Sequence, residues 1–256
     1  MSRTAVGQGI DVSTERIPLV LPHKTMPKNV TRPVIETRYP EADGEPMAET
    51  DVHRDLMTDA LLHPLKERFR QESDVYVSGN LFLYYEKGNP SAVVAPDVFV
   101  VFGVSNQQRR TYKLWEESKA PDVVFELTSG STYREDLSDK RLVYEMLGVR
   151  EYFLFDPLRD YLRPPLQGFR LNEFYYVSVM PEPWSEGEWQ IHSQVLGLTV
   201  RTDGPTLRLY DPEQDRYLFS RPEEAQARRL AEARATTAET EIARLQAILA
   251  RQESQN

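Results

Sequence analysis

Residues 121–155 read PDVVFELTSGSTYREDLSDKRLVYEMLGVREYFLF. The stretch opens with an apolar run from Val123 to Thr128, which predicts a buried strand. It closes with a second apolar run from Glu151 to Phe155, which predicts another strand. Two strands joined by a helix within about 35 residues are typical of a crossover unit whose strands run parallel. This unit predicts an α/β fold with a mixed sheet.

The linking helix carries start and stop signals of its own. Thr132 and Glu135 have the spacing of a capping box, in which two side chains satisfy free backbone amides at the helix start. Leu137 and Tyr144 recur on one helical face, and Gly148 stands where a left-handed residue commonly ends a helix. We therefore expect a helix between these limits.

The chain before this unit adds further elements. Apolar spacing predicts a helix from Val52 to Phe69 that Pro64 kinks or splits. Val75–Val77 and Leu81–Tyr85 predict two short strands or one bulged strand, and Asp97–Val104 predicts a buried strand. The expected core therefore has the order α-β-β-β-α-β.

Three regions are expected along the chain. Residues 1–45 contain five prolines with little periodicity and predict a disordered leader. Residues 46–220 form the expected domain, in which about 160–220 is a strand-rich extension. Residues 221–256 predict a polar helix that begins near Pro222.

The C-terminal helix has apolar residues at alternating steps of four and three. These residues are Ala231, Ala235, Ala238, Ile242, Leu245 and Leu249. This spacing is that of a coiled-coil seam, which favours a homodimer or another partner helix. The alternative is a single charged helix without a partner.

The composition limits the classes of protein. The chain has 256 residues and no cysteine, which excludes disulfides, thiolate zinc sites and a cysteine nucleophile. The net charge of −9 argues against a protein that coats nucleic acid, but a metal-dependent nuclease site is itself acidic. No run approaches the ~20 apolar residues of a membrane span, and no export signal pattern opens the chain. We therefore expect a cytoplasmic protein.

Two acidic residues and one lysine form the candidate site. Asp97 begins one predicted strand, although Pro96-Asp97 is also an ordinary turn sequence, and Glu126 lies inside the next strand. An ionised carboxylate within an apolar strand is costly to bury unless a cation pairs with it or a metal ion binds it. Two carboxylates and a backbone carbonyl suffice to hold Mg²⁺ or Mn²⁺. Lys140 on the following helix can orient an attacking water. These three residues meet the requirements of phosphodiester hydrolysis.

Ordinary ion pairs offer an alternative interpretation of the same residues. Glu126 has two candidate arginine partners on the helix, Arg134 and Arg141. Lys140 follows Asp136 by four residues, which is the spacing of a helical ion pair. In this interpretation the charges stabilise the fold and have no catalytic role.

An ordered series of short motifs runs from His53 to Pro157. The motifs are His53-Arg54-Asp55-Leu56, Leu81-Phe82-Leu83-Tyr84-Tyr85, Pro96-Asp97-Val98-Phe99-Val100-Val101, Pro121-Asp122-Val123-Val124-Phe125-Glu126-Leu127-Thr128-Ser129, Ser131-Thr132, Asp136-Leu137-Ser138-Asp139-Lys140, Tyr144 and Gly148-Val149-Arg150-Glu151-Tyr152. The series resembles the Uma-two family ("putative restriction endonuclease"), a branch of the PD-(D/E)XK nuclease superfamily. With the extension and the C-terminal helix, the resemblance covers most of residues 50–255.

The resemblance implies a restriction-endonuclease-like α-β-β-β-α-β core and a Mg²⁺-dependent endonuclease that cleaves DNA. It implies that Asp97 and Glu126 are metal ligands and that Lys140, on the helix, is the catalytic lysine. It also implies that His53, on the first helix, approaches the site.

The chain departs from the family pattern at two positions. Thr128 stands where the superfamily has its lysine, which leaves catalysis dependent on Lys140. Gly130 stands where the family often has proline, which predicts a looser loop beside the site. These departures leave a second function open, a catalytically silent protein of nuclease fold that acts through its C-terminal helix.

Overall fold

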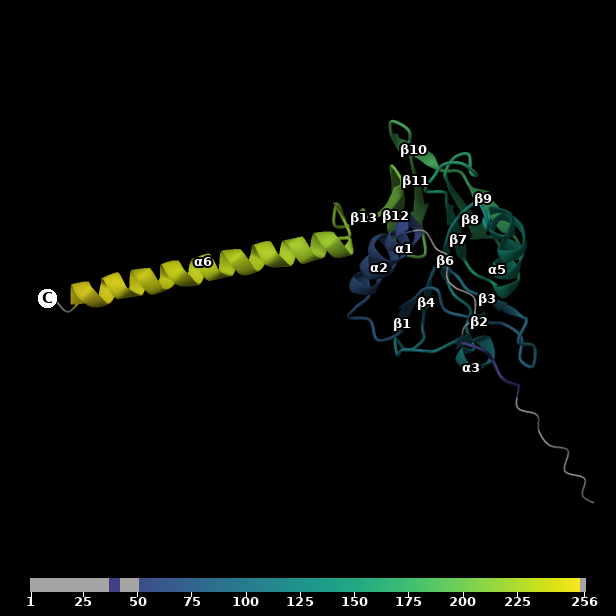
Figure 1. The fold of residues 1–256 in the computed structure, drawn as a ribbon, viewed down its shortest axis with the longest axis horizontal. Helices are drawn as coiled ribbons and strands as arrows, with labels where there is room; N and C mark the ends of the chain where they lie inside the picture. Colours follow the sequence, from purple (N-terminus) through teal and green to yellow (C-terminus); the bar gives the residue numbers. More distant parts are fainter. Residues whose placement is uncertain (1–36, 42–50, 254–256) are drawn as a thin grey trace, which may run out of the picture. The chain divides into compact units, whose positions relative to one another are not determined.

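The computed structural model describes residues 37–41 and 51–253 (Figure 1). The predicted leader lies outside this range except for residues 37–41. There the ring of Tyr39 packs against those of Tyr84 and Trp115 at centroid distances of 5.0 and 4.9 Å. None of the helices in the described ranges is long and apolar enough to cross a membrane.

The helices form two composite segments, one short helix and one long helix. They are α1 (Asp51–Asp55), η1 (Leu56–Leu62), α2 (His63–Arg68), α3 (Leu114–Glu117), α4 (Tyr133–Glu135), η2 (Asp136–Lys140), α5 (Arg141–Leu147) and α6 (Arg221–Glu253). The π-helical stretch η1 joins α1 to α2, and η2 joins α4 to α5. The predicted split of this helix falls beside Pro64: η1 ends at Leu62, and Pro64 stands in the first turn of α2, because it lacks the amide needed for a regular helical bond.

The main sheet has six strands. They are β1 (Val75–Ser78), β4 (Val98–Phe102), β6 (Val123–Leu127), β7 (Glu151–Phe155), β8 (Leu166–Leu171) and β9 (Tyr176–Val179), in the spatial order β1-β4-β6-β7-β8-β9. The pair β6–β7 is parallel, with Val123 opposite Glu151 and Leu127 opposite Phe155, and the other pairs are antiparallel. The mixed sheet and the parallel crossover unit predicted from residues 121–155 are thereby confirmed.

The segment predicted as Leu81–Tyr85 does not join the main sheet. It contributes β2 (Leu83–Tyr84) to a three-stranded sheet with β3 (Val93–Val94) and β5 (Tyr112–Lys113). The single bulged strand considered above is therefore wrong. The chain leaves the main sheet at Asn80, which has a positive φ of 49° and donates its amide to the carbonyl of Pro96.

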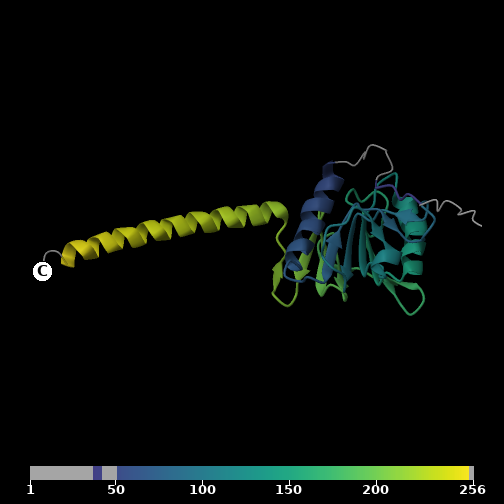
Figure 2. The same cartoon turned by 90° about the horizontal axis from the view of Figure 1, so that it is seen from below.

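Helices cover opposite faces of the main sheet, as Figure 2 shows for the α1–α2 segment on one side and α5 on the other. The main sheet has an apolar core on each face. Successive side chains of a strand point to opposite faces, so alternate residues of one strand contribute to the two cores. Phe125 belongs to the core on the α1–α2 side, together with Leu61 and Leu65. Val124 and Leu154 belong to the core on the other side, together with Tyr144 of α5.

The predicted strand-rich extension, about residues 160–220, divides between two sheets. Its first strands, β8 and β9, join the main sheet, and the strands that follow form a second sheet. Its strands are β10 (Glu182–Ser185), β11 (Glu188–Ser193), β12 (Leu198–Asp203), β13 (Thr206–Asp211) and β14 (Arg216–Tyr217), all antiparallel. Ile191, Val200 and Leu209 of its inner face share the core of the α1–α2 segment. The apolar face of η1 and α2 therefore packs against both this second sheet and the main sheet, while α1 has no buried residue.

The start of α4 differs from the prediction. Thr132 makes no side-chain bond to the helix backbone, so the capping box does not form. Its hydroxyl oxygen instead accepts the backbone amide of Ser129, at 3.1 Å. The predicted end is confirmed, because Gly148 caps α5 in the left-handed conformation with a φ of 79°.

Candidate active site

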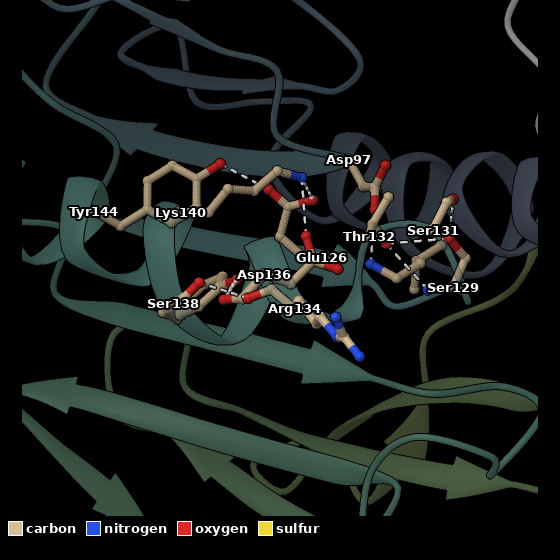
Figure 3. A network of polar contacts seen from close by, with 12 residues as sticks. Asp97, Glu126, Ser129, Ser131, Thr132, Arg134, Asp136, Ser138, Lys140 and Tyr144 are labelled. Atoms are coloured by element: carbon tan, nitrogen blue, oxygen red, sulfur yellow. Dashed lines mark hydrogen bonds and ion pairs between the residues drawn. The ribbon is translucent and has the colours of Figure 1, made fainter.

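The register of two strands brings Asp97 and Glu126 together. In the antiparallel pair β4–β6, Val98 lies opposite Phe125, so Asp97, which immediately precedes β4, comes beside Glu126 of β6. Successive side chains of a strand point to opposite faces of the sheet. Since Phe125 points toward the α1–α2 segment, Glu126 points to the other face, toward η2 and α5 (Figure 3).

Glu126 is buried and bonded at both oxygens. The Nζ of Lys140 lies 3.0 Å from its Oε2, and the hydroxyl of Tyr144 donates to its Oε1 at 2.7 Å. Burial raises the pKa of Tyr144 well above its usual value, and the charge of Glu126 raises it further. The hydroxyl therefore remains protonated and keeps donating to the carboxylate.

Three carboxylates share the single ammonium group of Lys140. Its Nζ also lies 3.0 Å from Oδ1 of the buried Asp136, and Asp97 acts on the same group through its charge. The pKa of Glu126 is raised to about 8, chiefly by burial; the charge of Lys140 opposes the rise, and the charges of Asp97 and Asp136 add to it. Burial lowers the pKa of Lys140, but the three carboxylates outweigh burial and raise it overall. Glu126 therefore tends to hold a proton near neutral pH while no cation is bound, and loss of that proton leaves three carboxylates around one ammonium group.

Asp97 is held from two sides. Its Oδ2 accepts the backbone amide of Leu127 at 2.6 Å, which ties it to the end of β6. Its Oδ1 lies 3.1 Å from Nε2 of His53, a residue of α1. All four residues predicted for the site, Asp97, Glu126, Lys140 and His53, therefore lie in one connected cluster, and their chemical roles remain proposals.

The arginine partners considered for Glu126 are occupied elsewhere. Arg134 donates to the hydroxyl of Tyr133 at 2.9 Å, and the guanidinium of Arg141 lies 5.0 Å from the ring centroid of Phe169. That alternative is wrong because Lys140 fills the position beside Glu126.

Sequence reasoning missed two members of the cluster. Asp136 is expected from the sequence as an ion-pair partner of Lys140 and Tyr144 as an apolar residue of the helix, and both stand in the family motifs, but neither is assigned to the site. The available signal is their spacing, because Asp136, Lys140 and Tyr144 follow one another at four-residue intervals and so share one helical face. The i, i+4 pair expected between Asp136 and Lys140 does form, in addition to the contact with Glu126.

The loop between β6 and α4 is closely packed. A Cβ atom at Gly130 would lie only 2.6 Å from the hydroxyl oxygen of Tyr161, so no larger residue fits without a shift. Within the same loop, the hydroxyl of Ser129 lies 3.0 Å from that of Ser131 and 3.1 Å from that of Thr132 (Figure 3). Gly130 thus permits a close contact with Tyr161 instead of loosening the loop.

Gly79 supports Asp97 through the backbone. A Cβ atom at this position would lie 2.1 Å from the carbonyl oxygen of Asp97. We expect Gly79→Ala to lower the free energy of unfolding by about 2 kcal/mol or more, because the clash is with backbone. Denaturant unfolding measures this change.

Gly168→Ala is the matched control for this prediction. Its added Cβ atom would meet Cδ1 of Ile191 at 2.9 Å, and this side-chain end can move. We expect a smaller loss there, about 1 kcal/mol. Equal losses for the two variants would show that the backbone at Asp97 yields easily.

Comparisons with known proteins place the chain in a family. The crystal structure of "a putative nuclease belonging to DUF820" from Anabaena variabilis ATCC 29413 is similar at 13% identity, covering 57% of this chain and 81% of that chain, with a TM-score of 0.38. No curated protein matches. The model of the family Uma2, described as "Putative restriction endonuclease", matches residues 35–239. Since this match spans most of the chain, the protein belongs to the Uma2 family of restriction-endonuclease-like proteins.

Proposed function

We propose that this protein is a Mg²⁺-dependent endonuclease that hydrolyses phosphodiester bonds in DNA, with Mn²⁺ able to replace Mg²⁺. The observation that supports it is the environment of Glu126. This carboxylate is 1% exposed and lies with Asp97 and Asp136 around one ammonium group. Excess buried negative charge is costly unless a cation offsets it, so the cluster suits a divalent metal ion.

The donor set fits Mg²⁺ by its chemistry. The ion prefers carboxylate oxygens and keeps several waters, so Asp97 and Glu126 suffice as its protein ligands. An ionised carboxylate offers about four acceptor positions, so Glu126 can keep Lys140 and Tyr144 as donors while it binds a metal ion. The described residues hold no group of three His, Asp or Glu side chains already arranged around a metal position. When bound, the ion would polarise the phosphoryl oxygen and lower the pKa of a bound water.

The protein's own residues supply positioning and charge. Lys140 remains protonated in this cluster, so it is suited to orient the attacking water and to stabilise charge that develops on the phosphate. Tyr144 holds Glu126 in place through its hydroxyl, and His53 holds Asp97. The position that carries a lysine in the superfamily is Thr128, which is buried, so the cationic role belongs to Lys140.

A second function has its own supporting observation. The Nζ of Lys140 lies 3.0 Å from both Glu126 and Asp136, so the carboxylates are partly neutralised without any metal ion. In a catalytically silent protein that acts through its C-terminal helix, these ion pairs with Lys140 would be enough to stabilise the buried carboxylates. The two functions differ in whether the cluster binds a metal ion.

Calorimetric titration with Mg²⁺ and with Mn²⁺ tests the proposal. We expect the full chain to bind either ion, and we expect Glu126→Gln to lower the affinity by about 10- to 100-fold or more, because the variant loses a charged ligand. Glu116→Gln is the matched control, since Glu116 is a surface residue of α3 that pairs with Lys113. It should bind as the unchanged chain does.

Two results would contradict the proposal. One is the absence of binding in the unchanged chain, which would favour the silent protein. The other is equal affinity in the unchanged chain and Glu126→Gln, which would place any metal ion elsewhere. Where binding follows the prediction, cleavage of supercoiled, linear and single-stranded DNA in Mg²⁺ identifies the substrate.

A further inference from the structure

Within the part of the chain that the structure describes, the C-terminal helix α6 contacts the domain only near its start. The carboxylate of Glu224 lies 2.5 Å from Nε2 of His63, and that of Glu223 lies 3.0 Å from Arg208. From Arg228 to Gln252 every residue is exposed. Most helices in proteins are stabilised by packing of one face, so this length of exposed helix calls for a partner.

One stripe of α6 has the spacing that a helical partner requires. It consists of Ala231, Ala235, Ala238, Ile242, Leu245 and Leu249, at steps of four and three residues. This spacing assigns Ala235, Ile242 and Leu249 to heptad position a, and Leu245 to position d. A β-branched residue at a followed by leucine at d favours two parallel strands, as Ile242 and Leu245 provide.

Parallel pairing also matches residue sizes. In a parallel pair each seam residue meets its own copy, so the three alanines meet alanines and the larger side chains meet larger side chains. The alanine layers allow a close approach of the two backbones, and Ile242, Leu245 and Leu249 supply most of the buried apolar surface. These three are 55%, 50% and 58% exposed in the single chain.

The charges beside the seam favour the same orientation. Arg234 occupies a g position, and a parallel partner brings it to Glu239 at the e position of the other helix. The e positions hold Glu232, Glu239 and Gln246. An antiparallel partner would bring these e positions against one another and would place glutamates together, which is unfavourable.

On the opposite face of α6, threonine hydroxyls form hydrogen bonds within the helix itself. The hydroxyls of Thr236, Thr237 and Thr240 donate to backbone carbonyls four residues earlier, at 3.0, 2.9 and 2.8 Å. In the heptad these threonines lie at b, c and f, away from the seam. The polar face thus suits water, and the apolar stripe is the face available for pairing.

We infer that α6 pairs with α6 of a second copy of this chain as a parallel two-stranded coiled coil. The parallel orientation places the two domains at the same end of the coiled coil, because each domain precedes its helix in the chain. The inference does not depend on the proposed function, since it rests on α6 alone.

Sedimentation velocity on the full chain tests the pairing. We expect the mass of two chains at micromolar concentration and the mass of one chain for the double variant Ile242→Glu with Leu245→Glu. The matched control is Ala243→Glu with Ala247→Glu, which adds the same charge at the b and f positions and should remain dimeric. A monomeric unchanged chain, or a double variant that remains dimeric, would overturn the inference.

Cross-linking tests the orientation, because the chain has no cysteine of its own. We expect Ala235→Cys and Leu249→Cys, prepared as separate variants, each to form a disulfide-linked dimer on mild oxidation. Both positions meet their own copies only in a parallel, in-register pair, since an antiparallel pair can bring at most one of them to the symmetry axis. Ala247→Cys on the outer face is the control and should form no disulfide-linked dimer. Cross-linking at one seam position alone would show antiparallel pairing.

Discussion

On the proposed function, replacement of Lys140 by methionine should lower the rate of DNA cleavage by about 100- to 10,000-fold. This is the usual range for loss of a group that acts on the attacking water and on transition-state charge. Methionine has nearly the length of lysine but carries no charge. The affinity for Mg²⁺ should stay equal or rise, because the ammonium group no longer competes for Glu126 and Asp136. Single-turnover cleavage together with calorimetry measures the two effects separately.

Lys140→Arg and a fold test serve as controls for this prediction. Arginine keeps the positive charge but presents it in a planar group, so we expect partial activity. Circular dichroism and thermal unfolding must show that Lys140→Met is folded before its rate is interpreted. A folded Lys140→Met variant that cleaves as fast as the unchanged chain would remove Lys140 from the chemistry. A weaker affinity for Mg²⁺ would show that Lys140 holds the carboxylates in place and does not compete with the ion.

Replacement of Glu151 by alanine should cause a large loss of stability, about 3–5 kcal/mol. Glu151 begins β7 and is 1% exposed, and its carboxylate joins the main sheet to the second sheet. It accepts bonds from Arg170 at 3.0 Å, from the hydroxyl of Ser193 and from the amide of Gln194 at 3.0 Å. Alanine would leave these donors without their acceptor, and a buried donor without an acceptor costs the full desolvation of that group.

Chemical denaturation followed by fluorescence measures this loss. Glu151→Gln should lose less, since the amide keeps one acceptor oxygen. Glu173→Ala is the control, because Glu173 is an exposed acid near the same end of β8. A loss below about 1 kcal/mol for Glu151→Ala would show that water replaces the carboxylate and that the two sheets are held together by apolar packing alone.

Local patterns were sufficient for much of the core. The apolar run around Glu126 and the run from Glu151 to Phe155 predict β6 and β7, and the periodic residues between them predict the helix. Local signals were weaker at the helix start, where Thr132 bonds to Ser129 and not to the helix. They were also weaker for Leu83 and Tyr84, because a strand-like sequence does not specify which sheet it joins.

The four predicted site residues came from motifs, and the contacts among them came from the structure. Asp136 and Tyr144 belong to the cluster because they share the helical face of Lys140, and this face points at Glu126 (Figure 3). The sequence carries their four-residue spacing, but that spacing also occurs on many helices whose polar face meets water. A polar helical face that forms part of a site is buried, whereas an ordinary one is exposed to water. Whether the face is buried depends on the sheet against which the helix packs.

The crossover unit, the burial of Glu126 within it and the end of the helix at Gly148 could be predicted from the sequence, because each depends on neighbours along the chain. The contacts of Lys140 with Glu126, and of His53 with Asp97, 44 residues further along the chain, could not. These contacts form only when the α1–α2 segment and the helix of η2 and α5 pack on the same sheet. That packing is set by the summed burial of many distant apolar residues, and no single stretch of sequence carries it.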